Sequence, residues 1–168
     1  MSISTTADAP TSLCFTTAPG VHVLATNQWV SAGLEDTFAL FSDAANLEAI
    51  TPPFMGFRIL TPLPIDMHEG TLIEYRLRLF GIPVFWRSRI ERWIPQHSFV
   101  DVQLRGPYAR WVHTHTFTAE DGGTRVRDRV EYSLPFAPLS EPVNALFVRP
   151  MVERIFRHRH ETIARLLG

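Results

Sequence analysis

The 168-residue sequence lacks several features that define common classes of protein. Its single cysteine, Cys14, excludes an internal disulfide and is compatible with a reducing compartment. The formal net charge of −1 provides no field that would attract nucleic acid or anionic lipid. No apolar run approaches the length of a membrane span. We therefore expect a cytoplasmic protein that neither binds nucleic acid nor inserts stably into a membrane.

The sequence also lacks the motifs of covalent and nucleotide-dependent catalysis. No nucleophile stands beside an assigned base, no glycine-rich phosphate loop is present, and no firm metal-ligand set is found. These absences favour binding of a ligand over covalent catalysis, and we predict no cofactor.

The composition is that of one globular domain. With 45% apolar and 20% charged residues, the chain is long enough to bury a core. Residues 1–19 are rich in serine, threonine, alanine and proline, so we expect a disordered or extended leader, frayed to about residue 18. Residues 20–168 are predicted to form the single domain.

The domain begins with one strand and two short helices. The composition of Val21–Val30 predicts the strand, and apolar residues at helical spacing predict a helix over Gly33–Phe41. Ser42 or Asp43 can cap a second helix, which Thr51–Pro53 must end because a residue before proline avoids helical geometry.

From residue 56 to about residue 134 the sequence reads as an antiparallel meander of strands. The segment Phe80–Pro83 is expected to be a loop, with a register that places Glu74 opposite Arg89 as an exposed ion pair. Alternation predicts which side chains of the two flanking strands share the inner face: Ile73, Tyr75, Leu77, Leu79, Trp86, Ser88 and Ile90.

The segment 111–117, WVHTHTF, places His113 and His115 on one strand face with two large aromatic side chains. A solvated face is rarely built from tryptophan and phenylalanine, so both imidazoles are expected to be enclosed and to need partners. The Asp121-Gly122 turn sets the register of the next strand, which brings Asp128 opposite His115 on the inner face.

The preceding turn is less defined. A turn centred on Pro107 would place Asp101 opposite His113, and Gln103 opposite Trp111. A loop of even length would instead turn the other face of that strand inward, with Val100, Val102 and Leu104.

A long helix is predicted from Leu139. Pro150 either kinks it or marks its start, and a kink there would make the helix a lid over a cavity, with Met151 adapting to the occupant. The arginines are interpreted as a solvated face: Arg149, Arg154, Arg157, Arg159 and Arg165. The stripe expected to face the sheet comprises Val143, Leu146, Phe147, Met151, Ile155, Thr162 and Leu166.

Three motifs carry a family resemblance: Phe41-Ser42-Asp43-Ala44-x-Asn46-Leu47-x-x-Ile50-Thr51-Pro52-Pro53, Gly70-Thr71-Leu72-Ile73-x-Tyr75, and Asp101-x-Gln103-x-x-Gly106-Pro107-Tyr108-x-x-Trp111-x-His113-x-His115-x-Phe117. With the element order, they resemble the SRPBCC superfamily of START domains, polyketide cyclases and plant allergens, in a bacterial cyclase/dehydrase-like, ligand-binding branch. The resemblance covers about Val21–Leu167 and implies an α+β helix-grip fold. In that fold a curved antiparallel sheet wraps around the C-terminal helix and leaves an apolar cavity between them.

That cavity is expected to bind a small hydrophobic molecule resembling a polyketide, lipid or quinone. If chemistry occurs, His113, His115 and Asp128 are the candidate catalytic residues for cyclase or dehydratase activity, with His113 or Tyr132 as the partner acid. The alternative is a non-enzymatic lipid or quinone carrier. The candidate ligand-binding residues are Tyr75, Leu77, Trp86, Asp101, Gln103, Trp111, Phe117, Tyr132, Met151 and Ile155.

The His–Asp pair also has interpretations that involve no catalysis. Most buried pairs of this kind are structural and satisfy groups that would otherwise cost about 1–3 kcal/mol each when unpaired. His113, His115 and Asp128 could also bind zinc as three ligands that leave the fourth coordination position open. However, no cysteine or third histidine lies nearby in the sequence.

Overall fold

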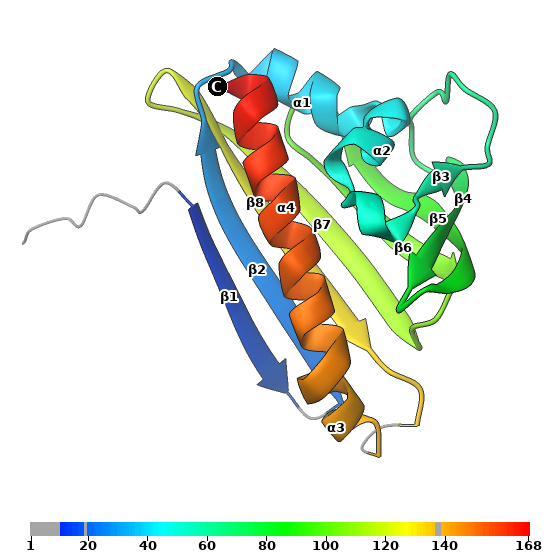
Figure 1. Ribbon diagram of the computed structural model, residues 1–168. Coiled ribbons are helices and arrows are strands. Elements are labelled where there is room, and N and C mark those ends of the chain that lie inside the picture. The colour runs from blue at the N-terminus through cyan, green and yellow to red at the C-terminus, as the bar shows by residue number, and fades with distance from the viewer. Residues whose placement is uncertain (1–10, 19, 137–138) are drawn as a thin grey trace, which may run out of the picture.

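The computed structural model describes residues 11–18, 20–136 and 139–168, in which an eight-stranded antiparallel sheet curves around one long helix (Figure 1). The spatial order of the strands is β1-β2-β8-β7-β6-β5-β4-β3. The strands are β1 Thr11–Ala18, β2 Val21–Val30, β3 Arg58–Ile59, β4 Leu72–Leu79, β5 Ile82–Ile94, β6 Ser98–Arg105, β7 Arg110–Glu120 and β8 Gly123–Ser133.

Short helices follow β2 and one long helical segment ends the chain. The helices are α1 Leu34–Ser42, α2 Leu47–Ile50, α3 Glu141–Val143 and α4 Arg149–Leu167, with 3₁₀ turns at Ala44–Asn46 and Pro53–Met55 and a π-helical turn at Asn144–Val148. This arrangement confirms the predicted α+β helix-grip fold. Within the described residues, no helix is both long and apolar enough to cross a membrane.

The first described residues belong to the sheet. Thr11–Ala18, which we expected to be a frayed or extended leader, are extended and pair with β2 along their whole length. This part of the leader is therefore an edge strand rather than a frayed end. The expectation for residues 1–10 and 19 lies outside the described residues.

The short helices after β2 form as predicted. Gly33 precedes α1, and the Asp43 carboxylate caps the next turn by accepting a hydrogen bond from the backbone N–H of Ala45 at 2.9 Å. The α2 helix ends at Ile50, directly before Thr51 and the two prolines. These helices cover one end of the concave face of the sheet, where Phe38 and Phe41 pack against Phe117.

The turn between β4 and β5 is tighter than expected. It consists of Phe80 and Gly81, which both have positive φ, and Leu79 pairs with Ile82. Glu74 therefore pairs with Arg87 and not with Arg89; the Arg87 Nε donates to Glu74 at 2.7 Å. The shift of two residues leaves the predicted inner face unchanged, because side chains alternate with a period of two.

The two hairpins that carry the histidines have the predicted registers. His115 pairs with Asp128, and Phe117 pairs with Val126. Asp101 pairs with His113, as the turn centred on Pro107 requires.

Of the two alternatives for Pro150, the structure confirms that it marks the start of the long α-helix, and the predicted kink is wrong. The α4 helix begins at Arg149 with Pro150 in its first turn, so Pro150 does not bend the interior of an α-helix. The preceding residues 144–148 form a wider π-helical turn, which accommodates a residue that has no N–H and whose ring would clash with the previous α-helical turn. The π turn places α3 and α4 in one continuous helical segment (Figure 1).

The face that this segment turns toward the sheet also differs from the predicted stripe. Leu146 is 69% exposed, and Val143, Phe147 and Leu166 are also exposed. A hydrophobic stripe misses the true face because that face also includes buried polar side chains. The buried positions are Asn144, Val152, Phe156, His160, Thr162 and Ile163.

Candidate functional site

A cavity of about 160 Å³ lies between the sheet, the short helices and α4. Its wall is largely apolar and aromatic, and α4 contributes Val152, Ile155, Phe156 and Arg159. Of the residues predicted to form the site, the following line it: Tyr75, Leu77, Trp86, Asp101, Trp111, His113, His115 and Ile155.

The remaining predicted residues lie elsewhere. Gln103 braces the turn before β7, because its side-chain amide donates to the Tyr108 carbonyl at 2.7 Å. Phe117 is buried in the core beneath α1. The Tyr132 hydroxyl donates to Asn144 Oδ1 at 2.9 Å in a separate network, so it is not available as the partner acid. Met151 is half-buried outside the cavity wall, so it does not adapt to an occupant there.

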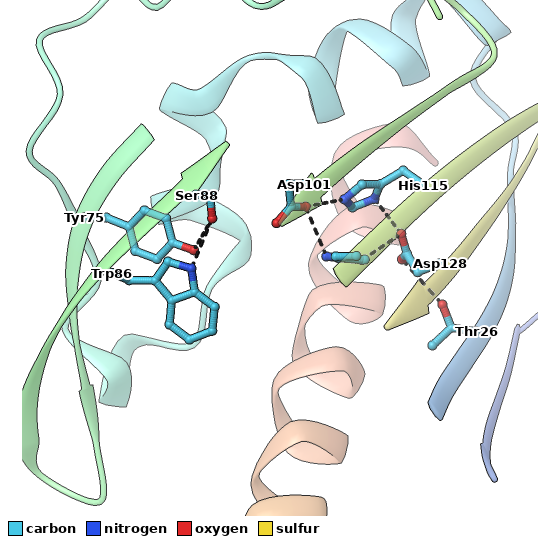
Figure 2. A network of polar contacts seen from close by, with 8 residues as sticks. Thr26, Tyr75, Trp86, Ser88, Asp101, His115 and Asp128 are labelled. Carbon is cyan, nitrogen blue, oxygen red and sulfur yellow. Dashed lines mark hydrogen bonds and ion pairs between the residues drawn. The ribbon is translucent and has the colours of Figure 1, made fainter. Parts of the chain in front are cut away.

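Two histidines and two aspartates form a cluster at one side of the cavity, in which His113, His115 and Asp128 are buried and Asp101 is half-buried (Figure 2). The shortest contact joins His115 Nδ1 to Asp128 Oδ1 at 2.6 Å, and His113 Nε2 lies 3.4 Å from the same oxygen. Asp101 Oδ2 lies 3.4 Å from His115 Nε2 and 3.6 Å from His113 Nδ1. Each imidazole thus lies between two carboxylates, and Asp128, which does not line the cavity, holds both rings from behind.

The β-strand alternation and two further contacts fix the cluster. His113 and His115 are two residues apart on β7, so their rings are adjacent, with centroids 3.8 Å apart. The ring of Phe99 stacks on His115 at 4.2 Å, and Thr26 Oγ1 donates to Asp128 Oδ2 at 3.4 Å. Of the cluster, only Asp101 and the two imidazoles face the cavity.

The pKa values of the two histidines shift in opposite directions. Burial favours the neutral form of His115, but the carboxylates of Asp128 and Asp101 outweigh burial and raise its pKa above the ordinary histidine value. Burial and the charge of His115 lower the pKa of His113. The cluster therefore favours a charged His115 beside a neutral His113.

Both carboxylates of the cluster are ionised. Burial would raise their pKa, but the histidines hold the pKa of Asp128 well below its usual range and lower that of Asp101. His113 Nε2, His115 Nδ1 and Asp128 Oδ1 are buried without a well-formed hydrogen bond, so their contacts are charge pairs with poor angles.

The opposite wall carries a second polar group. Trp86 Nε1 donates to Ser88 Oγ at 3.0 Å, and the Tyr75 hydroxyl lies 3.3 Å from the same oxygen (Figure 2). Burial raises the pKa of Tyr75, so its hydroxyl stays protonated. The cavity is therefore apolar between two polar walls, one of which carries hydroxyl groups and the other a charged cluster.

Sequence reasoning missed Arg159, Tyr108 and a polar role for Ser88. Arg159 had been assigned to the solvated face of the helix, yet it lines the cavity with its guanidinium 5.2 Å from the centroid of the Phe41 ring. A signal was present, because Arg159 follows Ile155 by four residues and so lies on the same helix face. Tyr108, in the turn before β7, packs against Trp111 with centroids 4.8 Å apart.

Asp101, His113 and His115 offer ligand atoms within 4.8 Å of one another, a spacing that a metal ion could use. The carboxylate in this set is Asp101, and not the Asp128 of the zinc hypothesis. The two carboxylates face the imidazoles of His113 and His115, and Arg159 adds positive charge at longer range. We interpret the cluster through acid–base chemistry.

Comparison with known proteins agrees with this geometry. A family model described as "Polyketide cyclase / dehydrase and lipid transport" matches residues 30–159. No curated protein sequence matches the chain significantly.

Solved structures share the fold at low sequence identity. The Zhui aromatase/cyclase from Streptomyces sp. R1128 has a TM-score of 0.67 and 15% identity, over 88% of this chain and 93% of that one. A START superfamily protein from Mycobacterium smegmatis has a TM-score of 0.66 and 10% identity, over 86% and 96% of the two chains. A protein from Thermus thermophilus has a TM-score of 0.67 and 18% identity, over 87% and 99%. The match of the family model over most of the sequence, on a helix-grip fold with an enclosed cavity, shows that this chain belongs to the polyketide cyclase/dehydrase and lipid transport family.

Proposed function

We propose that the cavity binds a small hydrophobic molecule bearing a carbonyl group, and that the His–Asp cluster moves a proton on it as in aldol-type cyclisation or dehydration. The observation that carries this proposal is the pair of adjacent histidines with opposite pKa shifts, His113 and His115, at the wall of an apolar cavity. Titratable neighbours whose pKa values are pushed apart are the usual arrangement of an acid with a base.

The aromatic half of the cavity supports a ring-shaped ligand. Trp86 meets Trp111 edge to face with centroids 5.4 Å apart and Tyr108 at 5.6 Å, which leaves flat apolar surfaces. The cavity volume of about 160 Å³ is close to the ~150 Å³ of an engineered apolar cavity that holds benzene. A ligand with one ring fits without rearrangement, and a larger polyketide-like ligand requires the cavity to widen.

The chemistry follows from the protonation states. Neutral His113 is the base that removes a proton from the carbon next to the carbonyl group, and Asp101 stabilises the imidazolium that results. The charged His115 or the Tyr75 hydroxyl donates to the carbonyl oxygen as negative charge develops there. Return of the proton to another atom completes an isomerisation, and loss of a β-hydroxyl group as water completes a dehydration.

The exchange of α-hydrogens for deuterium in benzylacetone, a one-ring methyl ketone, tests this chemistry without knowledge of the natural substrate. Proton NMR in D₂O should show exchange well above the buffer rate. His113→Asn should reduce the protein-dependent rate by roughly 10²–10⁴. Its effect on binding should stay within about 0.5–1.5 kcal/mol, the value of one hydrogen bond. His97→Asn, at an exposed turn, is the matched control and should exchange like the parent protein.

A second outcome distinguishes the carrier from the enzyme. If the parent protein binds benzylacetone but exchanges its α-hydrogens no faster than buffer, the cluster orients a ligand and performs no proton transfer. That result would favour the lipid or quinone carrier. Absence of any binding would contradict both functions.

A further inference from the structure

Arg159 is the one cationic side chain from α4 that lines the cavity. It lies one turn after Ile155 and stacks over the Phe41 ring at 5.2 Å. Phe41 in turn packs edge to face on His115, with centroids 6.0 Å apart. The guanidinium therefore lies at the same end of the cavity as the His–Asp cluster.

Arg159 has no polar partner among the described residues. It forms no hydrogen bond and no ion pair within 4 Å there, and its Nε is buried without an acceptor. Other arginines of the same helix have partners: Arg157 donates to Glu153 at 2.7 Å and Arg165 donates to Thr162 at 3.0 Å. A guanidinium that is partly removed from water and unpaired is unfavourable unless something else supplies an acceptor.

The two nearby carboxylates do not supply that acceptor. Asp101 and Asp128 feel the charge of Arg159 but lie beyond ion-pair distance, and each is already held by both histidines. The donors of Arg159 are thus left for a group that enters the cavity. A guanidinium presents paired N–H donors in one plane, a geometry that matches the two oxygens of a carboxylate.

We propose that Arg159 binds a carboxylate on the ligand, so that the cavity takes an aromatic or otherwise apolar carboxylic acid. This inference rests on the proposed function of the cavity and specifies the class of its ligand. The apolar body lies against Trp86 and Trp111, and the carboxylate lies beside Phe41. The carbonyl group that the proposed proton transfer requires then lies between these two ends of the ligand, near Asp101 and His113.

Binding of trans-cinnamate and trans-cinnamamide tests the inference, because the two have the same shape and differ in charge. Calorimetry should show that the parent protein binds cinnamate at least tenfold more tightly than cinnamamide. Arg159→Gln should remove this preference by weakening cinnamate binding about tenfold while cinnamamide binding stays the same. Arg157→Gln, on the exposed side of the same helix, is the matched control and should keep the preference.

The outcomes separate this inference from the proposed function. If both ligands bind equally to the parent, or if Arg159→Gln keeps the preference, the carboxylate site is refuted while the cavity still binds ligands. If neither ligand binds to the parent protein, the proposed function fails and this inference fails with it. NMR of the arginine Nε–H groups in the parent protein gives an answer even if the variant does not fold. The Arg159 signal should shift with cinnamate and not with cinnamamide, while that of Arg157 stays in place; a stationary Arg159 signal would overturn the inference.

Discussion

Replacement of Asp128 by asparagine should show how much the buried cluster depends on that one carboxylate. The Asp128 side chain is 2% exposed and carries the shortest contact of the cluster, 2.6 Å to His115. Asparagine keeps the shape but removes the charge, so His115 loses its nearest counter-ion. Removal of one partner from a buried pair costs about 3–5 kcal/mol, out of a typical total stability of about 5–15 kcal/mol. At roughly 2–4 °C per kcal/mol for a chain of this size, the melting temperature should fall by about 6–20 °C.

The cost should depend on pH in a direction that the pKa shifts determine. The folded-state pKa of His115 is raised, so its pairing stabilises the protein fully below the ordinary histidine value of about 6.5 and is lost as the pH rises through the folded value. The pKa of Asp128 is lowered, so its contribution is present above about 4 and is lost as the pH falls through its folded value. The difference between the parent and Asp128→Asn should therefore be largest near pH 5–6 and smaller at pH 9.

The pKa of His113 is lowered on folding, whereas that of His115 is raised. The prediction therefore concerns the difference in stability between parent and variant and not the stability of the parent alone. The folded-state pKa of His113 is lowered, so protonation below about 6.5 favours the unfolded chain and opposes the effect of His115 in the parent protein. Urea unfolding at pH 5.5, 7 and 9 measures the difference, with the exposed Asp121→Asn as matched control. A variant at position 128 whose stability lies within about 0.5 kcal/mol of that control at pH 5.5 would refute the buried charge pair.

Two further predictions concern residues outside the cavity. Tyr132→Phe should destabilise the protein by about 1–3 kcal/mol in urea unfolding, because Asn144 loses a buried hydrogen-bond partner. Benzylacetone binding should stay unchanged. A change in binding without a change in stability would contradict the assignment of Tyr132 to a network separate from the cavity. Gly81→Ala should destabilise the protein by about 1 kcal/mol, because φ is +80° at this position. Gly33→Ala is the control and should have a smaller effect, because Gly33 has a negative φ and open space around it. Equal melting temperatures of the two variants would contradict the proposed backbone strain at Gly81.

The sequence was sufficient to predict the pairing at the centre of the site. Side chains alternate along a strand, and Asp121-Gly122 fixes where β7 turns into β8, so the position of Asp128 opposite His115 follows from counting. Asp101 opposite His113 was harder to predict, because a proline-containing loop of unknown length allowed either face of β6 to point inward. The motifs that resemble the family supplied the overall fold and the existence of a cavity.

The buried face of the C-terminal helical segment was predicted less well, because a pattern of apolar residues does not reveal polar side chains that are buried. Asn144 and His160 are buried on this face, where Asn144 Oδ1 accepts a hydrogen bond from Tyr132, whereas Leu146 and Phe147 are exposed. The π turn before Pro150 also changes the spacing of positions along the segment, which a constant helical period cannot anticipate. Arg159 was assigned to solvent for the same reason, since a charged side chain is normally placed outside when its neighbours are unknown.

A crystal structure with benzylacetone bound tests the central claim most directly. The account predicts the ring between Trp86 and Trp111, with the carbonyl oxygen within hydrogen-bond distance of His115 or the Tyr75 hydroxyl and the α-carbon nearest to His113. A ligand bound outside the cavity, or one whose carbonyl group points away from both polar walls, would contradict it.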